Sequence, residues 1–93
     1  MAKVARSVRV CGRVQGVFYR AWTCQRAREL GVMGWVWNLH NGSVEARLEG
    51  EEEAVERLIH QMREGPPGAQ VTDLEFNEVE LENLDYFDVR PTS

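Results

Sequence analysis

An Asn-Gly pair in the middle of the chain separates two runs that have the residue pattern of β-strands. Both central positions of a tight hairpin turn need a positive φ, which Asn41 and Gly42 adopt readily. Before the pair, residues 32–39 are rich in β-branched and aromatic side chains. After it, residues 44–49 alternate between apolar and charged side chains, as in a strand with one buried face. The sequence therefore predicts an antiparallel hairpin at the centre of the fold.

Segments with helical features flank this hairpin on both sides. Small and apolar residues recur at near-helical spacing over about residues 21–30, and Gly31 is suited to end that helix. On the other side, residues 51–53 are three consecutive glutamates, whose negative charge suits the N-terminus of a helix. An apolar stripe over residues 54–62 follows, and the Gly-Pro-Pro-Gly sequence at 65–68 ends it. The sequence therefore predicts two helices.

The outer parts of the chain carry further strand patterns. Valines at positions 8, 10 and 14 share one face of a strand over residues 7–14. Residues 71–81 predict a fourth strand, in which the parity of the apolar residues changes. This change predicts a β-bulge near residues 77–78. Apolar residues at 87 and 89 predict a short final strand.

The element order is thus β-α-β-β-α-β with a short fifth strand, which is typical of the ferredoxin-like split β-α-β arrangement. We expect an α+β fold with both helices on one face of an antiparallel sheet, and strand 32–39 at an edge of that sheet. The 93 residues are enough for one core and too few for two, so residues 1–93 are predicted to form a single domain. This fold hosts many functions, so the function has to be argued from a site.

Composition excludes several classes of protein. No apolar run approaches the ~18 residues of a membrane-spanning helix, and the first residues lack the apolar stretch of a secretory signal. Two cysteines are too few for a disulfide scaffold, so we expect a reducing, cytoplasmic location. We also expect a monomer without membrane contact. The net charge of −4 argues against a main role in neutralising nucleic-acid phosphates. The strand over residues 44–49 also lacks the aromatic signature of RNA-binding sheets.

The junction at residues 12–20, between the first strand and the first helix, carries the most chemical information. Gly12 and Gly16 permit a tight loop with converging N–H groups, and such a loop before a helix N-terminus can bind an anion. Arg20 can fold back over it and bind the same anion through two parallel hydrogen bonds. The glycine spacing fits neither a Walker loop nor a dinucleotide fingerprint. On spacing alone, a phosphate-binding loop and a simple turn followed by an exposed arginine both remain open.

Other chemically capable residues are predicted to be structural. Cys11 is too far from Arg20 along the chain for a phosphocysteine enzyme, and Cys24 falls on the apolar face of the first helix. His40 and His60 stand alone, so we expect surface positions for them and no metal site. The tryptophans at 35 and 37 share one strand face and are expected to pack there or to line a cleft.

Two motifs resemble the signatures of the acylphosphatase family. The first is Gly12-Arg13-Val14-Gln15-Gly16-Val17-Phe18-Tyr19-Arg20, and the second is Gly34-Trp35-Val36-Trp37-Asn38, followed by Asn41-Gly42-Ser43-Val44-Glu45. The similarity covers nearly the whole chain, with the same element order. It implies hydrolysis of a small acyl phosphate to a carboxylate and inorganic phosphate, without a metal or other cofactor, and with inorganic phosphate as an inhibitor.

The resemblance also implies roles for individual residues. The phosphoryl group would be held by the Arg20 side chain and by the backbone amides of Val14, Gln15, Gly16, Val17 and Phe18. Asn38 would orient the attacking water. Thr23, one helical turn after Arg20, is a candidate for a hydroxyl that supports the site.

The chemistry of this reaction is compatible with so few side chains. A carboxylate is the conjugate base of an acid with a pKa of about 4, so it departs at neutral pH without a general acid. The amide of Asn38 cannot act as a base, so we expect a phosphoryl oxygen of the substrate to accept the proton of the water. Of the alternatives, an RNA-binding module is disfavoured by the strand over residues 44–49. Two others remain open: a domain that senses phosphate without turnover, and the front domain of a larger carbamoyl-transferring maturation enzyme.

Overall fold

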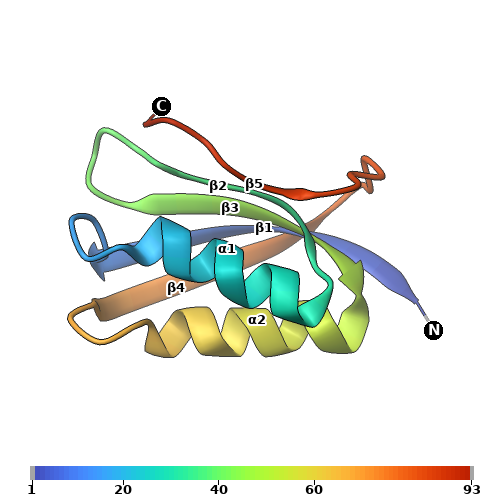
Figure 1. The fold of residues 1–93 in the computed structure, drawn as a ribbon, viewed down its shortest axis with the longest axis horizontal. Helices are drawn as coiled ribbons and strands as arrows, with labels where there is room; N and C mark the ends of the chain where they lie inside the picture. Colours follow the sequence, from blue (N-terminus) through green and yellow to red (C-terminus); the bar gives the residue numbers. More distant parts are fainter. Residues whose placement is uncertain (1, 93) are drawn as a thin grey trace.

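The computed structural model describes residues 2–92 and folds them into a five-stranded sheet with two helices on one face (Figure 1). The elements are β1 (Lys3–Arg13), α1 (Tyr19–Leu30), β2 (Met33–Asn38), β3 (Val44–Glu51), α2 (Glu52–Glu64), β4 (Gln70–Val79) and β5 (Phe87–Val89). The strand order across the sheet is β4-β1-β3-β2-β5. The α+β, ferredoxin-like fold class predicted from the sequence is confirmed.

The short fifth strand changes the sheet in two ways. β5 pairs with β2 in parallel, with Gly34 opposite Phe87 and Val36 opposite Val89, whereas the other strand pairs are antiparallel. The sheet is therefore mixed rather than wholly antiparallel. The expectation that strand 32–39 lies at a sheet edge is wrong, because β5 covers that side of β2. The pairing stops at Val36, so Asn38 lies beyond it.

The predicted bulge near residues 77–78 is also wrong. β1 and β4 pair regularly from Ala5 opposite Val79 to Cys11 opposite Asp73, and the register shifts only between Cys11 and Gly12. Directly opposed residues share a face of the sheet, so Val79 lies on the same face as Ala5, which is buried at the helix-free side. The apolar positions of β4 therefore change from one face of the strand to the other because its last residues lie against a covered surface on the helix-free side. No inserted residue is involved.

The main core lies between the sheet and the helices. Its sheet side consists of valines, alanine and leucine at alternating positions, and its helix side of one stripe from each helix. The fully buried members include Val8, Val10, Val36, Val44, Ala46 and Leu48 from the sheet, and Tyr19, Ala27, Val55, Leu58 and Met62 from the helices. Cys24 is buried in this core as predicted.

Both helices begin and end close to the predicted positions. α1 begins at Tyr19 rather than near residue 21, and Phe18 precedes it in the left-handed region with a φ of 61°. Gly31 ends this helix in the same region, with a φ of 73°. α2 carries Glu52 and Glu53 in its first turn, where their negative charge interacts favourably with the positive end of the helix dipole.

Candidate active site

The loop over residues 14–18 connects β1 to α1 and is fixed at both ends. Val14 and Tyr19 are each 1% exposed, so a buried side chain anchors the loop at each end. The Tyr19 hydroxyl donates a hydrogen bond of 2.6 Å to the Met62 carbonyl in α2, and burial raises the pKa of this tyrosine. Between the anchors, Gly16 (φ 75°) and Phe18 (φ 61°) both have positive φ angles, which turn the backbone into the helix. The loop is therefore a fixed feature of the fold.

The side chain of Gln15 ties this loop to the β2–β3 hairpin. Its Nε2 donates to the backbone carbonyls of Leu39 at 2.8 Å and Ser43 at 2.9 Å. Both donors of the amide are thus used to hold the loop beside the end of β2. Nothing local in the sequence marks this role, because the two acceptors are backbone atoms 24 and 28 positions away.

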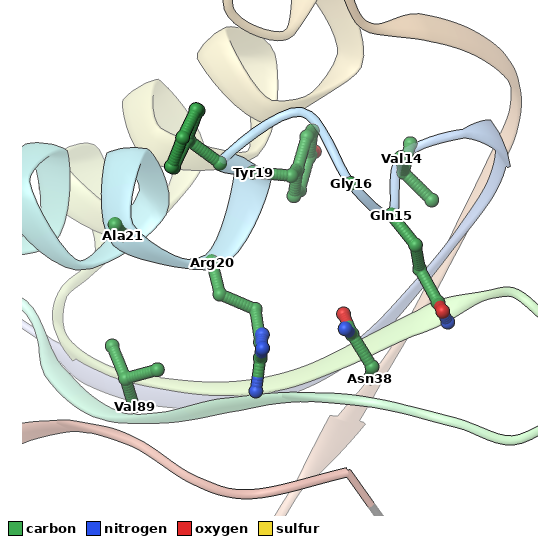
Figure 2. A pocket seen from close by; sticks show the side chains of 9 residues that line it. Val14, Gln15, Gly16, Tyr19, Arg20, Ala21, Asn38 and Val89 are labelled. Carbon is green, nitrogen blue, oxygen red and sulfur yellow. The ribbon is translucent and has the colours of Figure 1, made fainter.

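A cleft of about 370 Å³ opens between this loop, α1 and the end of β2. It is lined by Val14, Gln15, Gly16, Phe18, Tyr19, Arg20, Ala21, Asn38 and Val89. Figure 2 shows the side chains of Arg20, from α1, and Asn38, from β2, extending into the same space. The two residues that the sequence analysis singled out are therefore brought together. Of the predicted loop residues, Val17 does not line the cleft and packs against the core.

Arg20 is held in this orientation by the other end of the chain. Its Nη1 donates to the Arg90 carbonyl at 2.8 Å, and the Arg90 N–H donates to the Val36 carbonyl at 2.9 Å. One of the five guanidinium N–H donors is thus used for positioning, and the side chain still lines the cleft. The sequence analysis did not detect this contact.

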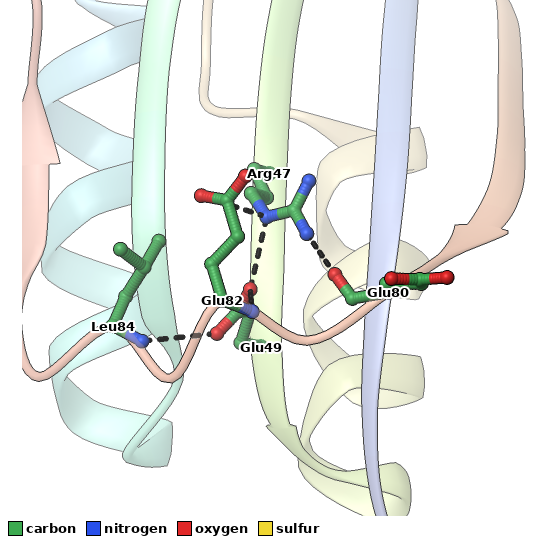
Figure 3. Close-up of polar contacts among 5 residues, drawn as sticks. All are labelled: Arg47, Glu49, Glu80, Glu82 and Leu84. Atoms are coloured by element: carbon green, nitrogen blue, oxygen red, sulfur yellow. Dashed lines mark hydrogen bonds and ion pairs between the residues drawn. The ribbon is translucent and has the colours of Figure 1, made fainter.

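The connection between β4 and β5 crosses the helix-free face of the sheet (Figure 3). Glu49, at 2% exposure, accepts N–H bonds from Glu82 at 2.8 Å and Leu84 at 3.1 Å. Arg47 donates through Nε to the same carboxylate at 2.9 Å and through Nη2 to the Glu80 carbonyl. We call these five residues the crossover clasp. It fixes the connection between β4 and β5 to the middle of the sheet.

The side-chain oxygen of Asn38 has an unusual environment. Oδ1 is buried, and within residues 2–92 no donor lies within hydrogen-bonding distance of it. Buried acceptors without a partner are rare in folded proteins, and a bound water satisfies them. Asn38 as a residue lines the cleft, so its carboxamide group borders a space that a water can enter. Thr23 is fully buried, does not line the cleft, and its Oγ1 likewise finds no partner among the described residues. Its support for the site stays a prediction.

The remaining candidates lie outside the cleft. Trp35 and Trp37 pack against each other with ring centroids 4.7 Å apart, and the Arg90 guanidinium lies 4.8 Å and 5.8 Å from their respective ring centroids. Cys11, half-buried on β1, and the exposed His40 do not line it either.

Over residues 2–92, no three His, Cys, Asp or Glu side chains are grouped as metal ligands. Neither helix in the same range has the length and apolar character needed to span a membrane.

Comparison with known proteins identifies the family of this chain. The acylphosphatase family model matches residues 6–89. An acylphosphatase from Methanothrix thermoacetophila is 51% identical over 82 residues, which cover 88% of this chain and 91% of that protein. The structure of an acylphosphatase from Coxiella burnetii superposes with a TM-score of 0.92 at 39% identity, covering 95% of this chain and 93% of that one. The crystal structure of acylphosphatase from Bacillus subtilis gives 0.91 at 33% identity, covering 94% and 98%. The chain therefore belongs to the acylphosphatase family, whose members are hydrolases.

Proposed function

We propose that this chain hydrolyses the carboxyl–phosphate bond of small acyl phosphates, with Arg20 and the loop amides holding the phosphoryl group and Asn38 orienting the water. The observation that carries the proposal is the shared cleft. The side chains of Arg20 and Asn38 extend into it from different elements, beside a fixed loop. Because these groups all come from one chain, we propose that a monomer suffices.

The phosphoryl group needs donors that are in place before it binds. The loop over residues 14–18 would offer backbone N–H groups, and Arg20 would offer paired donors in a planar fork. Preorganised donors of this kind stabilise the charge that gathers on the transferring phosphoryl oxygens. The hydrogen bond from Arg20 to Arg90 limits the freedom of the guanidinium before substrate arrives.

The water would be oriented by the carboxamide of Asn38 and attack phosphorus in line. Its oxygen forms the new P–O bond, while the bond from phosphorus to the acyl oxygen breaks and the carboxylate leaves with the electron pair. A carboxamide does not take up a proton at neutral pH, so the proton of the water passes to a phosphoryl oxygen of the substrate. The products are a carboxylate and inorganic phosphate. The rate of hydrolysis should therefore show no essential enzyme base that titrates near neutral pH.

The test is hydrolysis of benzoyl phosphate with no added metal and with a chelator present. Arg20→Gln should lower kcat/KM by about 10²–10³-fold, as loss of a preorganised donor does in other hydrolases, and should weaken competitive inhibition by inorganic phosphate. Asn38→Ala should lower kcat by a similar factor and leave phosphate inhibition nearly unchanged, because the water is not part of phosphate binding.

Matched controls are available on the same elements or sheet. Arg26→Gln changes a residue of α1 outside the cleft, and Asn77→Ala changes an exposed residue of β4. Both should react like the parent. The assignment of roles is wrong if Arg20→Gln and Asn38→Ala retain parental turnover and phosphate inhibition.

A further inference from the structure

The cleft does not end at Arg20. A second, open cavity of about 520 Å³ lies along α1 and β5, and it shares Ala21 and Val89 with the cleft. From this junction it continues past Cys24 and Gln25 to Arg28. We call it the α1–β5 groove. Ala21 is exposed and Val89 is 40% exposed, so within the described chain nothing covers the junction.

The direction of the reaction relates the groove to the substrate. In an in-line displacement, the attacking and leaving oxygens lie on opposite sides of phosphorus. Figure 2 shows Arg20 between Asn38 on one side and Ala21 with Val89 on the other. Asn38 lines only the cleft, whereas Ala21 and Val89 line both cavities. With the phosphoryl group in the cleft and the water on the Asn38 side, the carboxylate departs away from Asn38, and the groove opens from the cleft at Ala21 and Val89.

We propose that the α1–β5 groove binds the acyl group of the substrate and that Ala21 and Val89 determine which acyl groups fit. This inference rests on the proposed function and extends it to the part of the substrate that the phosphoryl site does not touch. The junction carries a methyl and an isopropyl group, so the first part of the acyl group meets apolar surface. Farther along, the groove is polar and charged, with one arginine and two carboxylates: it is lined there by Gln25, Arg28, Glu29 and Asp88. One Arg28 donor is already bonded to the Phe87 carbonyl at 3.3 Å. The favoured substrates are acyl phosphates with an apolar acyl group larger than acetyl.

The small side chain at position 21 gives a direct test. A leucine there extends from an exposed helix position and has a strong helix propensity, so the fold is retained while the entrance to the groove narrows. The measured quantity is the ratio of kcat/KM for benzoyl phosphate to that for acetyl phosphate. In Ala21→Leu this ratio should fall about tenfold, which corresponds to about 1.4 kcal/mol. Acetyl phosphate is the internal reference for the phosphoryl site.

A second variant tests the opposite wall without changing its bulk. Val89→Thr replaces a methyl group by a hydroxyl, so the wall becomes polar while its shape is kept. The ratio of kcat/KM for benzoyl phosphate to that for acetyl phosphate should again fall, here severalfold. Arg57→Leu is the control, because it puts leucine at an exposed helix position on α2 outside both cavities, and its ratio should equal that of the parent.

The outcomes separate the two proposals. Ratios equal to the parental one in both Ala21→Leu and Val89→Thr would overturn the assignment of the groove and leave hydrolysis itself established. A parent that hydrolyses neither substrate would overturn the proposed function, and this inference with it.

Discussion

Three consecutive residues, the one before α1 and the first two of the helix, have three different environments. Phe18 is exposed in a left-handed conformation, Tyr19 is buried, and Arg20 lines the cleft. The buried member connects the two helices, since its hydroxyl is bonded to the Met62 carbonyl in the last turn of α2. The last four carbonyls of a helix lack partners within the helix, so this bond supplies one of them. Tyr19 thereby fixes the helix end from which Arg20 extends.

Tyr19→Phe tests this anchor. It should lower the free energy of unfolding by about 1–3 kcal/mol, because the ring still fills the core while a buried carbonyl loses its only side-chain donor. Urea unfolding followed by tryptophan fluorescence measures the change. Tyr86→Phe is the control, since Tyr86 is 60% exposed, and it should unfold like the parent. Equal stability of Tyr19→Phe and parent would contradict an anchoring role.

The same tyrosine predicts a pH dependence. Burial raises its pKa in the folded state above the ordinary value of about 10. The stabilisation is therefore complete below pH ~10 and decreases as the pH rises further, because the unfolded state ionises first. In urea titrations between pH 9 and about 11, the parent should lose stability faster than Tyr19→Phe. Parallel losses would show that Tyr19 is not the group responsible.

At the level of single residues, the candidate catalytic residues could be predicted from the sequence, but the residues that hold them in place could not. Arg20 and Asn38 were predicted because they stand in motifs with recognisable neighbours. The Gln15 side chain donates to a backbone carbonyl 24 positions away, and the Arg90 carbonyl accepts from the Arg20 side chain 70 positions away. No local pattern in the sequence records such contacts. Their roles became visible only once the elements were placed side by side.

Among the elements, the connection between β4 and β5 explains two expectations that failed. It lies on the helix-free face, where it is held by Glu49, so apolar residues at the end of β4 face a second covered surface. It then brings β5 alongside β2, which removes β2 from the sheet edge. A parity change can arise from a bulge or from a second covered face, and a strand of three residues gives too short a pattern to place. The paired elements of the main core were predictable because their periodicities extend over longer segments.

The crossover clasp gives a prediction at this scale. Desolvation alone would raise the pKa of Glu49, but the hydrogen bonds from the Glu82 N–H, Arg47 and the Leu84 N–H outweigh it and hold the pKa below its ordinary value. A lowered pKa means that the stabilisation is complete above the ordinary pKa of glutamate and is lost as the pH falls toward the folded-state value. Glu49→Gln should therefore destabilise the protein by about 1–3 kcal/mol at pH 7, and the difference from the parent should shrink under acid conditions.

Hydrogen exchange locates the effect in this prediction. The amides of Glu82 and Leu84 should exchange faster in Glu49→Gln, since an amide is a weaker acceptor than a carboxylate. Glu75→Gln, an exposed residue of β4, is the control and should leave both amides protected. Unchanged exchange at Glu82 and Leu84 in the Glu49 variant would mean that the clasp does not hold the crossover.

At the scale of the whole molecule, the site connects the first helix to the residue that follows the last strand. Arg20 lies in the first helix and its acceptor belongs to Arg90, just after the last strand. β5 has only three residues, so its own ladder supplies few hydrogen bonds to hold the Arg90 carbonyl in place. Here the guanidinium of Arg90 stacks on Trp35 and Trp37, while its N–H bonds to β2. The tryptophan pair on the helix-free face therefore contributes to the orientation of Arg20 on the other side of the sheet.

Arg90→Ala tests this connection, because it removes the stacked cation and keeps both backbone hydrogen bonds possible. A cation–π contact at an exposed site contributes about 0.5–1 kcal/mol, so kcat/KM for acetyl phosphate should fall about two- to fivefold. Arg90→Lys should recover part of the loss, because an ammonium group can lie over the same rings. Inhibition by inorganic phosphate should weaken together with kcat/KM, since a less fixed Arg20 binds product and substrate less well. Arg57→Ala, on the exposed side of α2, is the control. If Arg90→Ala matches the parent in both measurements, the backbone bonds alone orient Arg20 and the tryptophan stack serves only the packing of the sheet.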